Sequence, residues 1–259
     1  MTTTSKQPRN AIESARRTIE LELRAVEQLQ HRIDESFTHA VELLSAVKGR
    51  VIVSGMGKSG HIGNKIAATL ASTGTPAQFV HPAEACHGDM GMITRSDAAL
   101  LMSNSGTTAE ITALLPLLKR LGLPIVAMTG NPDSTLARAA DAHLNISVDE
   151  EACPLDLAPT ASTTANLVMG DALAIAMLEQ SGFTAEDFAF THPGGALGRR
   201  LLTRVSDVLV TGSDIPKVSL TMSLADALME ISAKGLGMST VVDDNDRLLG
   251  IFTDGDLRR

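Results

Sequence analysis

Between residues 50 and 148, short apolar and β-branched runs alternate with single stretches of helical character. The expected strands are Arg50–Ser54, Ala77–Val80, Ala98–Ser103, Pro124–Thr129 and His143–Val148, and the expected helices between them are Lys58–Ser72, Thr108–Leu121 and Ser134–Ala140. Strands separated by one helix each form βαβ units, whose strands are parallel and whose helices cover both faces of the sheet. The pattern therefore predicts an α/β fold with a doubly wound, five-stranded parallel sheet.

Helical segments are expected on both sides of this alternating region. Apolar residues recur mostly at steps of three and four over residues 9–47, which predicts a helical arm (residues 1–48) that buries its apolar stripe on its own domain or on a partner subunit. The run Ser162–Gln180 predicts a long apolar helix with small residues along it, and the helical signal stops near Gly182–Gly198. The main domain is therefore expected to cover residues 49–204.

A second unit is expected over residues 205–259. Its pattern predicts a short strand at Val208–Val210, a helix at Leu224–Lys234, and strands at Thr240–Val242 and Leu248–Phe252. A unit of about 55 residues is marginal for an independent hydrophobic core.

Composition narrows the class of protein. The formal charge is −8, and the chain has no Trp or Tyr and six Phe, which argues against a nucleic-acid-binding surface. Two cysteines, Cys86 and Cys153, are too few for a disulfide framework and fit a reducing compartment. No apolar run approaches the roughly 18 residues of a membrane span. We expect a soluble cytoplasmic protein without nucleic-acid or membrane partners.

Three of the expected strands end in loops rich in glycine and hydroxyl side chains, namely Ser54–Gly60, Ser103–Thr108 and Thr129–Asn131. In an open parallel sheet, ligands bind at the carboxyl ends of the strands, where such loops meet. Exposed N–H groups at helix starts and hydroxyl donors suit the oxygens of a phosphate. Each loop alone is better explained by turn formation and helix capping, but three on one edge favour a site for a phosphorylated ligand.

Two nucleotide-binding motifs are incomplete. Gly55, Gly57 and Gly60 have the spacing of the dinucleotide fingerprint, but His81 stands where the acidic residue at the end of the next strand is expected. A Walker A loop would need glycine at position 52, which is Ile52. We therefore rank a dinucleotide oxidoreductase below a site for another phosphorylated ligand.

Four residues near these loops could carry proton chemistry. Lys58 could pair with phosphate or with a developing oxyanion, and His192 is held between Thr191 and Pro193-Gly194-Gly195. Glu110 could equally be a carboxylate that stabilises a helix start, and Glu151 a solvated loop charge. His81 and His87 do not have a structural zinc spacing, so substrate contacts are favoured over a required metal, although two imidazoles could bind zinc adventitiously.

Several motifs together resemble the sugar isomerase (SIS) domain family, and within it the arabinose 5-phosphate isomerases. They are Gly55–His61, Ala71–Pro76, Ser103–Gly106, Glu151–Leu155, Leu157–Thr160, Met169–Ala174 and His192–Gly198. The tail Gly250–Arg259 is similar to a cystathionine-β-synthase (CBS) motif. Family members carry two such motifs in tandem, so residues 205–259 are expected to form an incomplete CBS module.

The resemblance implies an aldose–ketose isomerisation between D-ribulose 5-phosphate and D-arabinose 5-phosphate, the first step of Kdo synthesis for lipopolysaccharide, in a homotetramer. It implies catalytic roles for Lys58, Glu110, Glu151 and His192. Contacts to the sugar phosphate are assigned to Gly57, Ser59, Gly74, Thr75, His81, His87, Ser103, Asn104, Ser105 and Thr108. No cofactor is required, and His81 is a candidate ligand for inhibitory zinc.

The isomerisation needs a base at carbon, and a free Glu with a pKa of about 4.3 is a weak one. We expect burial to raise the pKa of one of the two glutamates, and we favour Glu151 over Glu110 as the carbon base. The alternative function is a SIS-domain regulator that senses a sugar phosphate without converting it. Such a regulator would need the hydroxyl-rich loops but not Glu151 and His192 together.

Overall fold

The structure is a computed structural model that describes residues 10–257 of the chain. Residues 1–9 and 258–259, which include the start of the predicted arm and the end of the CBS motif, lie outside the described residues. The chain divides into two compact units, residues 1–198 and 199–259. The division falls inside helix α10 (Ala196–Leu202), before the boundary at residue 204 expected from the sequence. The two units are described separately.

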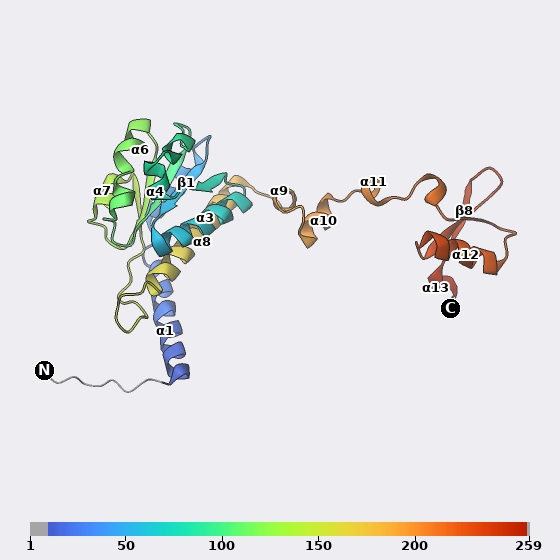
Figure 1. Cartoon of the computed structure of the whole chain (residues 1–259), viewed down its shortest axis with the longest axis horizontal. Coiled ribbons are helices and arrows are strands. Elements are labelled where there is room, and N and C mark those ends of the chain that lie inside the picture. Colours follow the sequence, from blue (N-terminus) through green and yellow to red (C-terminus); the bar gives the residue numbers. More distant parts are fainter. Residues whose placement is uncertain (1–9, 258–259) are drawn as a thin grey trace. The chain divides into compact units, whose positions relative to one another are not determined.

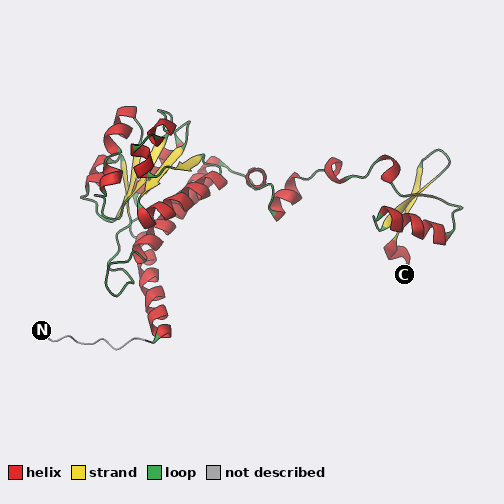
Figure 2. Cartoon of the chain, in the orientation of Figure 1, coloured by secondary structure: helices red, strands yellow, loops and turns green. Residues whose placement is uncertain are grey.

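The first unit contains a five-stranded, entirely parallel sheet (Figures 1 and 2). The strands are β1 (Val51–Gly55), β2 (Ala77–Phe79), β3 (Ala98–Met102), β4 (Ile125–Thr129) and β5 (Ala142–Asn145), in the order β2-β1-β3-β4-β5. Every residue of β1, β3 and β4 is buried, as expected for strands covered by helices on both faces. The predicted fold class is confirmed.

Two hydrophobic cores lie on the two faces of this sheet. Val53 and Leu100 belong to one core, which also contains Leu44, Ile66 and Leu173 from the covering helices. Alternate strand residues, such as Ile52 and Leu101, belong to the other core, which contains Leu118 and Leu136. Because successive side chains of a strand point to opposite faces, one short apolar run supplies both cores.

The helices of the first core are α1 (Ala11–Gln30), α2 (Glu35–Ser45), α3 (Gly57–Ser72) and α8 (Ala161–Ser181). The opposite face carries the short helices α4 (Pro82–Cys86), α5 (Ala109–Thr112), α6 (Leu115–Leu121) and α7 (Thr135–Ala139), together with the 3-10 turn Asp89–Met92. Figure 1 shows α3 and α8 side by side, apart from α6 and α7.

Three sequence expectations about these helices are wrong. The predicted helix over residues 9–47 is interrupted before Glu35, where the Asp34 carboxylate accepts a hydrogen bond from the Ser36 amide and starts α2. The predicted helix Thr108–Leu121 is split into α5 and α6, and α6 begins with Pro116 in its first turn, a position that proline favours. The region 182–198 still contains a helix, α9 (Ala185–Thr191), which starts with a Thr184–Asp187 capping box.

Helices α3 and α8 pack as parallel neighbours. Lys65 of α3 forms an ion pair with Asp171 of α8. A Cβ atom added at Gly170 would lie 2.2 Å from Ile66 Cδ1, and one added at Gly74 would lie 2.4 Å from the ring of Phe183. Later residues of one helix segment therefore contact later residues of the other, so the two helices run in the same direction. It follows that their N-termini lie at one end of the sheet and their C-termini at the other.

The second unit is a small α/β module. Its sheet has the order β6-β7-β8, with β6 (Lys217–Ser219) parallel to β7 (Met238–Val242) and β7 antiparallel to β8 (Leu248–Thr253). Its helices are α11 (Val205–Val208), α12 (Leu224–Lys234) and α13 (Asp254–Leu257), with a 3-10 turn at Gly212–Asp214. The strand expected at Val208–Val210 is absent from the described residues, because α11 ends there and Leu209 follows as its C-cap.

Candidate active site

Three polar loops meet at the carboxyl edge of the first sheet. The strand register pairs Gly55 with Met102, and Met102 with Met128, so the loops that follow β1, β3 and β4 begin at one level. The Gly130 amide donates to the Asn104 carbonyl (2.9 Å), which ties the loop after β4 to the loop after β3. The sequence argument from strand ends therefore holds for these loops in space.

The loop Ser103–Thr108 is held by its own hydroxyl groups. Ser103 Oγ and Thr108 Oγ1 lie 2.8 Å apart and share a hydrogen bond, and the Gly106 amide donates to Ser103 Oγ (3.1 Å). Gly106 has a φ of +65°, and an added Cβ would lie 2.0 Å from Ser134 Oγ. Asn104 and Ser105 are exposed at the tip. Hydrogen bonds within the loop therefore hold its shape, and its tip presents polar groups to solvent.

Gly57, Lys58 and Ser59 form the first turn of α3, directly after β1. Gly57 has a φ of +55°, and Lys58 is exposed. The free N–H groups and the dipole of this 16-residue helix favour an anion at this end. Lys58 adds a full positive charge at the same place.

Glu151 lies at the N-terminus of α8. Its Oε2 accepts hydrogen bonds from the Thr160 amide (2.7 Å), Thr160 Oγ1 (3.0 Å) and the Ser162 amide (3.2 Å). Because α3 and α8 run parallel, Glu151 lies at the same end of the sheet as Lys58. Glu151 and Asn104 also line one cavity of about 320 Å³. The structure therefore places Lys58, Asn104 and Glu151 at the same edge of the sheet, with Asn104 and Glu151 in one cavity.

The environment of Glu151 contradicts the expectation that burial raises its pKa. Burial does act to raise the pKa of this carboxyl, but the hydrogen bonds from Ser162 and Thr160 outweigh it, and the net pKa lies below the ordinary value. Donors that bind a carboxylate favour its charged form. At neutral pH Glu151 is therefore ionised and tied to the helix terminus, which makes it a weaker carbon base than expected.

The helices α4 and α5 carry three further candidate residues, His81, His87 and Glu110. His81 follows β2 and precedes α4, and Ser54 Oγ of β1 donates to the preceding Val80 carbonyl (2.7 Å). His81 Nδ1 is buried without a hydrogen-bond partner among the described residues. His87 lies at the other end of α4, and Glu110 lies in the first turn of α5, which packs against α4.

A metal site built by several side chains is not found here. Among residues 10–257, no group of three or more His, Cys, Asp and Glu side chains is placed to hold a metal ion. The proposed zinc ligand His81 therefore has no ready set of companions within the described part of one chain.

The structure separates Gly74, Thr75 and His192 from these residues. Thr191 Oγ1 donates to the Ser72 carbonyl at the C-terminus of α3 (3.4 Å), and Gly74 and Thr75 follow that helix directly. Lys58 stands at the opposite end, about 20 Å away along the axis at roughly 1.5 Å per residue. Within one chain, neither edge of the sheet therefore holds all four expected catalytic residues, which are Lys58, Glu110, Glu151 and His192.

The His192 ring is held at that amino edge. It stacks on Phe188 with ring centroids 4.1 Å apart, and its Nδ1 lies 3.1 Å from the Phe188 carbonyl and 3.0 Å from Thr191 Oγ1. These contacts fix the orientation of the imidazole and occupy Nδ1. Nε2 is thus the nitrogen left to meet a substrate.

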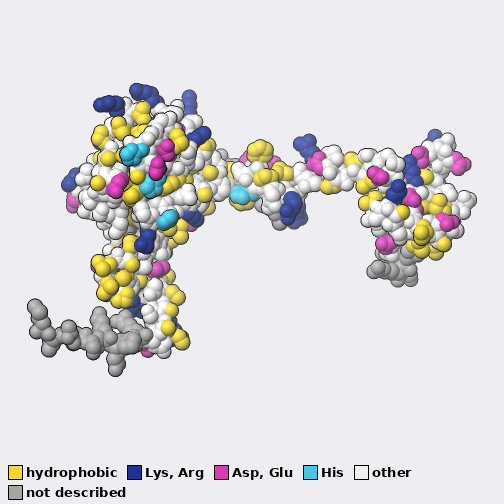
Figure 3. Space-filling view, viewed as in Figure 1, with side chains coloured by type: hydrophobic (Ala, Val, Ile, Leu, Met, Phe, Trp, Pro, Cys, Tyr) yellow, Lys and Arg dark blue, Asp and Glu magenta, His cyan; other side chains and the backbone are white. Residues whose placement is uncertain are grey.

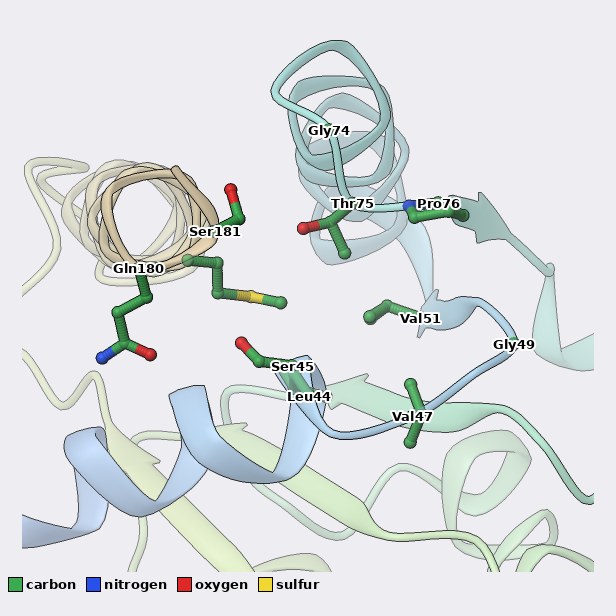
Figure 4. A pocket seen from close by; sticks show the side chains of 11 residues that line it. Leu44, Ser45, Val47, Gly49, Val51, Gly74, Thr75, Pro76, Gln180 and Ser181 are labelled. Atoms are coloured by element: carbon green, nitrogen blue, oxygen red, sulfur yellow. The ribbon is translucent and has the colours of Figure 1, made fainter. Parts of the chain in front are cut away.

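A separate cavity of about 340 Å³ lies beside Gly74 and Thr75 at the amino edge (Figure 4). Ser45, Thr75, Gln180 and Ser181 supply its polar groups, from the ends of α2, α3 and α8. None of the described residues that line it is charged. It therefore lacks the cation and helix N-terminus that favour a phosphate at the carboxyl edge.

Sequence reasoning missed the residues that hold Glu151. Thr160 and Ser162 bind its carboxylate, and Arg17 of α1 donates to the Ala152 carbonyl (2.7 Å). The sequence offers no signal for Thr160, because it lies two residues before the predicted helix Ser162–Gln180 and its side chain does not cap the observed helix. No local pattern could have indicated Arg17, because the residues it joins are far apart in sequence.

Comparison with known proteins identifies the family. Residues 43–176 match the SIS domain, and residues 205–259 match the CBS domain. The arabinose 5-phosphate isomerase KdsD of Pseudomonas aeruginosa is 66% identical over 248 residues, which cover 96% of this chain and 76% of the relative. The chain belongs to the arabinose 5-phosphate isomerase family. KdsD of Escherichia coli K12 is 58% identical over 247 residues, covering 95% of this chain and 75% of the relative.

A solved structure also resembles this arabinose 5-phosphate isomerase family member. Escherichia coli CFT073 c3406 in complex with arabinose 5-phosphate has 43% sequence identity and a TM-score of 0.69, and the match covers 74% of this chain and 100% of that chain. The predicted resemblance to the SIS and CBS families is thus confirmed.

Two surface features bear on partners. Helix α8 is the one helix in the described residues that is long and apolar enough to cross a membrane, and half of that apolar window is buried within the structure. Hydrophobic side chains gather at the loop before α8 and along α1 (Figure 3). Leu155 and Leu157 of that loop are 75% and 79% exposed.

Proposed function

We propose that this protein interconverts D-ribulose 5-phosphate and D-arabinose 5-phosphate through a cis-enediolate, as the first step of Kdo synthesis. The observation that carries the proposal is the convergence of Lys58, Glu151 and the Ser103–Thr108 loop at the end of the sheet where α3 and α8 begin. The 66% identity to a curated arabinose 5-phosphate isomerase supports the same substrate.

The phosphate group is assigned to the loops after β1 and β3. Ser105 supplies a hydroxyl donor, and the hydrogen-bonded pair of Ser103 and Thr108 supplies one more, because one of its two protons is used within the pair. The first turn of α3, with Gly57 and Ser59, supplies backbone N–H groups. Several donors that are fixed before binding lose little conformational freedom when the anion arrives. This leaves the other end of the pentose free to face the carboxylates.

Glu110 is assigned as the base that removes the carbon-bound proton. The alternative, Glu151, has its pKa lowered by the hydrogen bonds at the start of α8, although burial opposes them. An ionised Glu151 instead accepts hydrogen bonds from sugar hydroxyl groups and holds C1 and C2 in place. Lys58 stabilises the negative charge that develops on the oxygen of the enediolate.

His192 is assigned to the site of a neighbouring copy, where it assists ring opening or moves a proton between O1 and O2. Its position with Gly74 and Thr75, at the far end of α3 from Lys58, supports this assignment. The exposed Leu155 and Leu157 would be covered by such an assembly. We propose a homotetramer in the cytoplasm, in which each site draws on two chains.

No cofactor is needed for this reaction, because every step is a proton transfer or charge stabilisation by side chains. His81, with its buried and unpartnered Nδ1, contacts the sugar in this scheme, as does His87. Inhibition by zinc at His81 is part of the proposal and would require ligands from the substrate or from a second chain.

The proposal is tested by isomerisation in D2O. We expect arabinose 5-phosphate to acquire deuterium at C2 as ribulose 5-phosphate forms, and we expect the Glu110→Gln variant to abolish the exchange. Tight binding of arabinose 5-phosphate by the wild-type protein, with neither exchange nor turnover, would instead identify a sugar-phosphate sensor.

A further inference from the structure

The hydroxyl group of Thr160 makes two hydrogen bonds around Glu151. Thr160 Oγ1 donates to Glu151 Oε2 (3.0 Å) and accepts from the Ala152 amide (2.8 Å). A hydroxyl has one proton to donate, so these two bonds fix its direction. The Thr160 side chain therefore joins the carboxylate of residue 151 to the backbone of the next residue.

These bonds close the loop 151–160 at its base. The Ala152 residue is 3% exposed, and its carbonyl accepts from Arg17 Nη2 (2.7 Å) while its amide donates to Thr160. The Glu151 amide donates to Asp156 Oδ1 (3.1 Å) within the loop. The backbone around Glu151 is thus held from α1, from the start of α8 and from inside the loop.

We propose that Thr160 is a positioning residue for the isomerisation, whose hydroxyl holds the Glu151 carboxylate at the cavity that Glu151 shares with Asn104. This inference rests on the proposed function, in which Glu151 contacts the sugar. Thr160 does not cap α8 with its own side chain. The Glu151 carboxylate binds the Thr160 and Ser162 amides instead, and the Thr160 hydroxyl is left to orient that carboxylate.

Removal of the hydroxyl should change both the geometry and the titration of Glu151. Thr160→Val keeps the shape of the side chain but deletes one donor to the carboxylate, so the charged form loses support and the pKa of Glu151 rises. The other ionisable groups around Glu151 are unchanged in this variant, namely Arg17, Glu22, Asp149, Glu150, Cys153 and Asp156.

The experiment compares three single variants in the full chain. We expect Thr160→Val to lower kcat about 10-fold with little change in KM, and to move the acidic limb of the pH–kcat profile to higher pH. Thr160→Ser should restore both quantities to within about 2-fold of the wild type. Thr163→Val is the matched control, because Thr163 Oγ1 lies in the same helical turn but donates to the Thr160 carbonyl (2.8 Å), and it should leave kcat and the profile unchanged.

A double variant tests whether Thr160 acts through Glu151. Adding Thr160→Val to Glu151→Gln should lower kcat by less than about 2-fold more, since residues that act as a unit are not additive. A full 10-fold further loss, a Thr160→Ser variant as slow as Thr160→Val, or an unshifted acidic limb would each overturn the inference.

A readout independent of activity separates this inference from the proposed function. The Glu151 side-chain carboxyl carbon can be titrated by NMR in the wild-type, Thr160→Ser and Thr160→Val proteins. We expect a raised pKa in Thr160→Val only. If the wild-type protein fails to isomerise while this titration behaves as expected, the proposed function fails and the contact of Thr160 with Glu151 stands. An unchanged titration in Thr160→Val overturns the positioning role. If Thr160→Val does not fold, Thr160→Ala, which also lacks the hydroxyl, takes its place.

Discussion

The two edges of the SIS sheet differ in chemistry. The carboxyl edge carries the start of α3 with Lys58, the hydroxyl-rich loop after β3, and an ionised Glu151 at the start of α8. The amino edge carries Gly74, Thr75 and the oriented imidazole of His192 beside an uncharged cavity. One edge thus combines a cation with hydroxyl groups and a helix N-terminus, which suit a phosphate, whereas the other carries an imidazole and no charged lining residue.

Under the proposed function, one chain holds two halves of a site rather than a whole one. The halves lie at opposite ends of the 16-residue helix α3, so no side-chain rotation can join them. In a symmetric assembly, the carboxyl edge of one copy can meet the amino edge of another. Each prediction below alters one edge and asks whether the other depends on it.

The largest effect is expected at the carboxyl edge. Glu110→Gln should lower kcat by about 10³–10⁴-fold, near the upper range for loss of a general base, while Glu151→Gln should lower it by about 10²-fold, as for loss of an electrostatic contact to the reacting group. Steady-state kinetics with ribulose 5-phosphate measure both. The reverse order of the two losses would return the role of carbon base to Glu151.

Most of this edge could be predicted from sequence, because strand ends and glycine-rich turns are local signals. The loops Ser54–Gly60 and Ser103–Thr108 were expected on one edge, and the register of β1, β3 and β4 places them there. The pKa of Glu151 was not predictable. Its direction depends on Thr160 and Ser162, whose approach is set by the fold of the loop 151–160 and not by any local spacing.

The next effect links the two edges. His192→Ala should lower kcat about 10²-fold, and Lys58→Ala should be similarly impaired because the charge on the enediolate is then unopposed. If each site combines Lys58 of one chain with His192 of another, co-expression of the two variants should restore about one quarter of the sites, since each residue is intact in half of the copies.

The control for this mixture is co-expression of Lys58→Ala with Glu110→Gln. Both residues belong to the carboxyl edge of one chain, so no intact site can form and activity should stay at the level of the single variants. Equal activity in the two mixtures would show that His192 does not act across a subunit boundary.

Sequence reasoning could name His192 but could not place it. The segment 182–198 was expected to lack helix, yet α9 (Ala185–Thr191) directs the chain back to the end of α3. Gly74 and Thr75 show the same limit. Their motif follows the helix Gly57–Ser72, and the length of that helix sends them to the opposite edge from Lys58.

A smaller effect is expected from the phosphate loop. Ser103→Ala removes the hydroxyl that binds both Thr108 Oγ1 and the Gly106 amide, at a cost of about 1 kcal/mol for a lost hydrogen bond. We expect KM for ribulose 5-phosphate to rise about 5–10-fold with kcat within about 3-fold of the wild type. Ser45→Ala in the amino-edge cavity is the matched control and should leave KM unchanged; an equal rise in both variants would contradict a phosphate site confined to the carboxyl edge.

The smallest effect concerns the pH dependence of stability at the carboxyl edge. The folded protein lowers the pKa of Glu151, because hydrogen bonds from Ser162 and Thr160 outweigh burial. A group whose pKa is lowered by folding stabilises the protein above its unfolded pKa of about 4.3, and this stabilisation is lost as the pH falls through the lower folded value. The carboxylate is partly exposed, so solvent screening keeps this contribution to stability small.

Tm measured from pH 6 to pH 3 should therefore fall more steeply in the wild type than in Glu151→Gln, by about 1–2 °C over the range. Burial also lowers the pKa of His143, against the opposing effects of Thr129 and Asp34. Because both proteins contain His143, its contribution cancels when the two Tm curves are subtracted. Parallel Tm curves would show that the hydrogen bonds at the start of α8 do not hold Glu151 in its charged form.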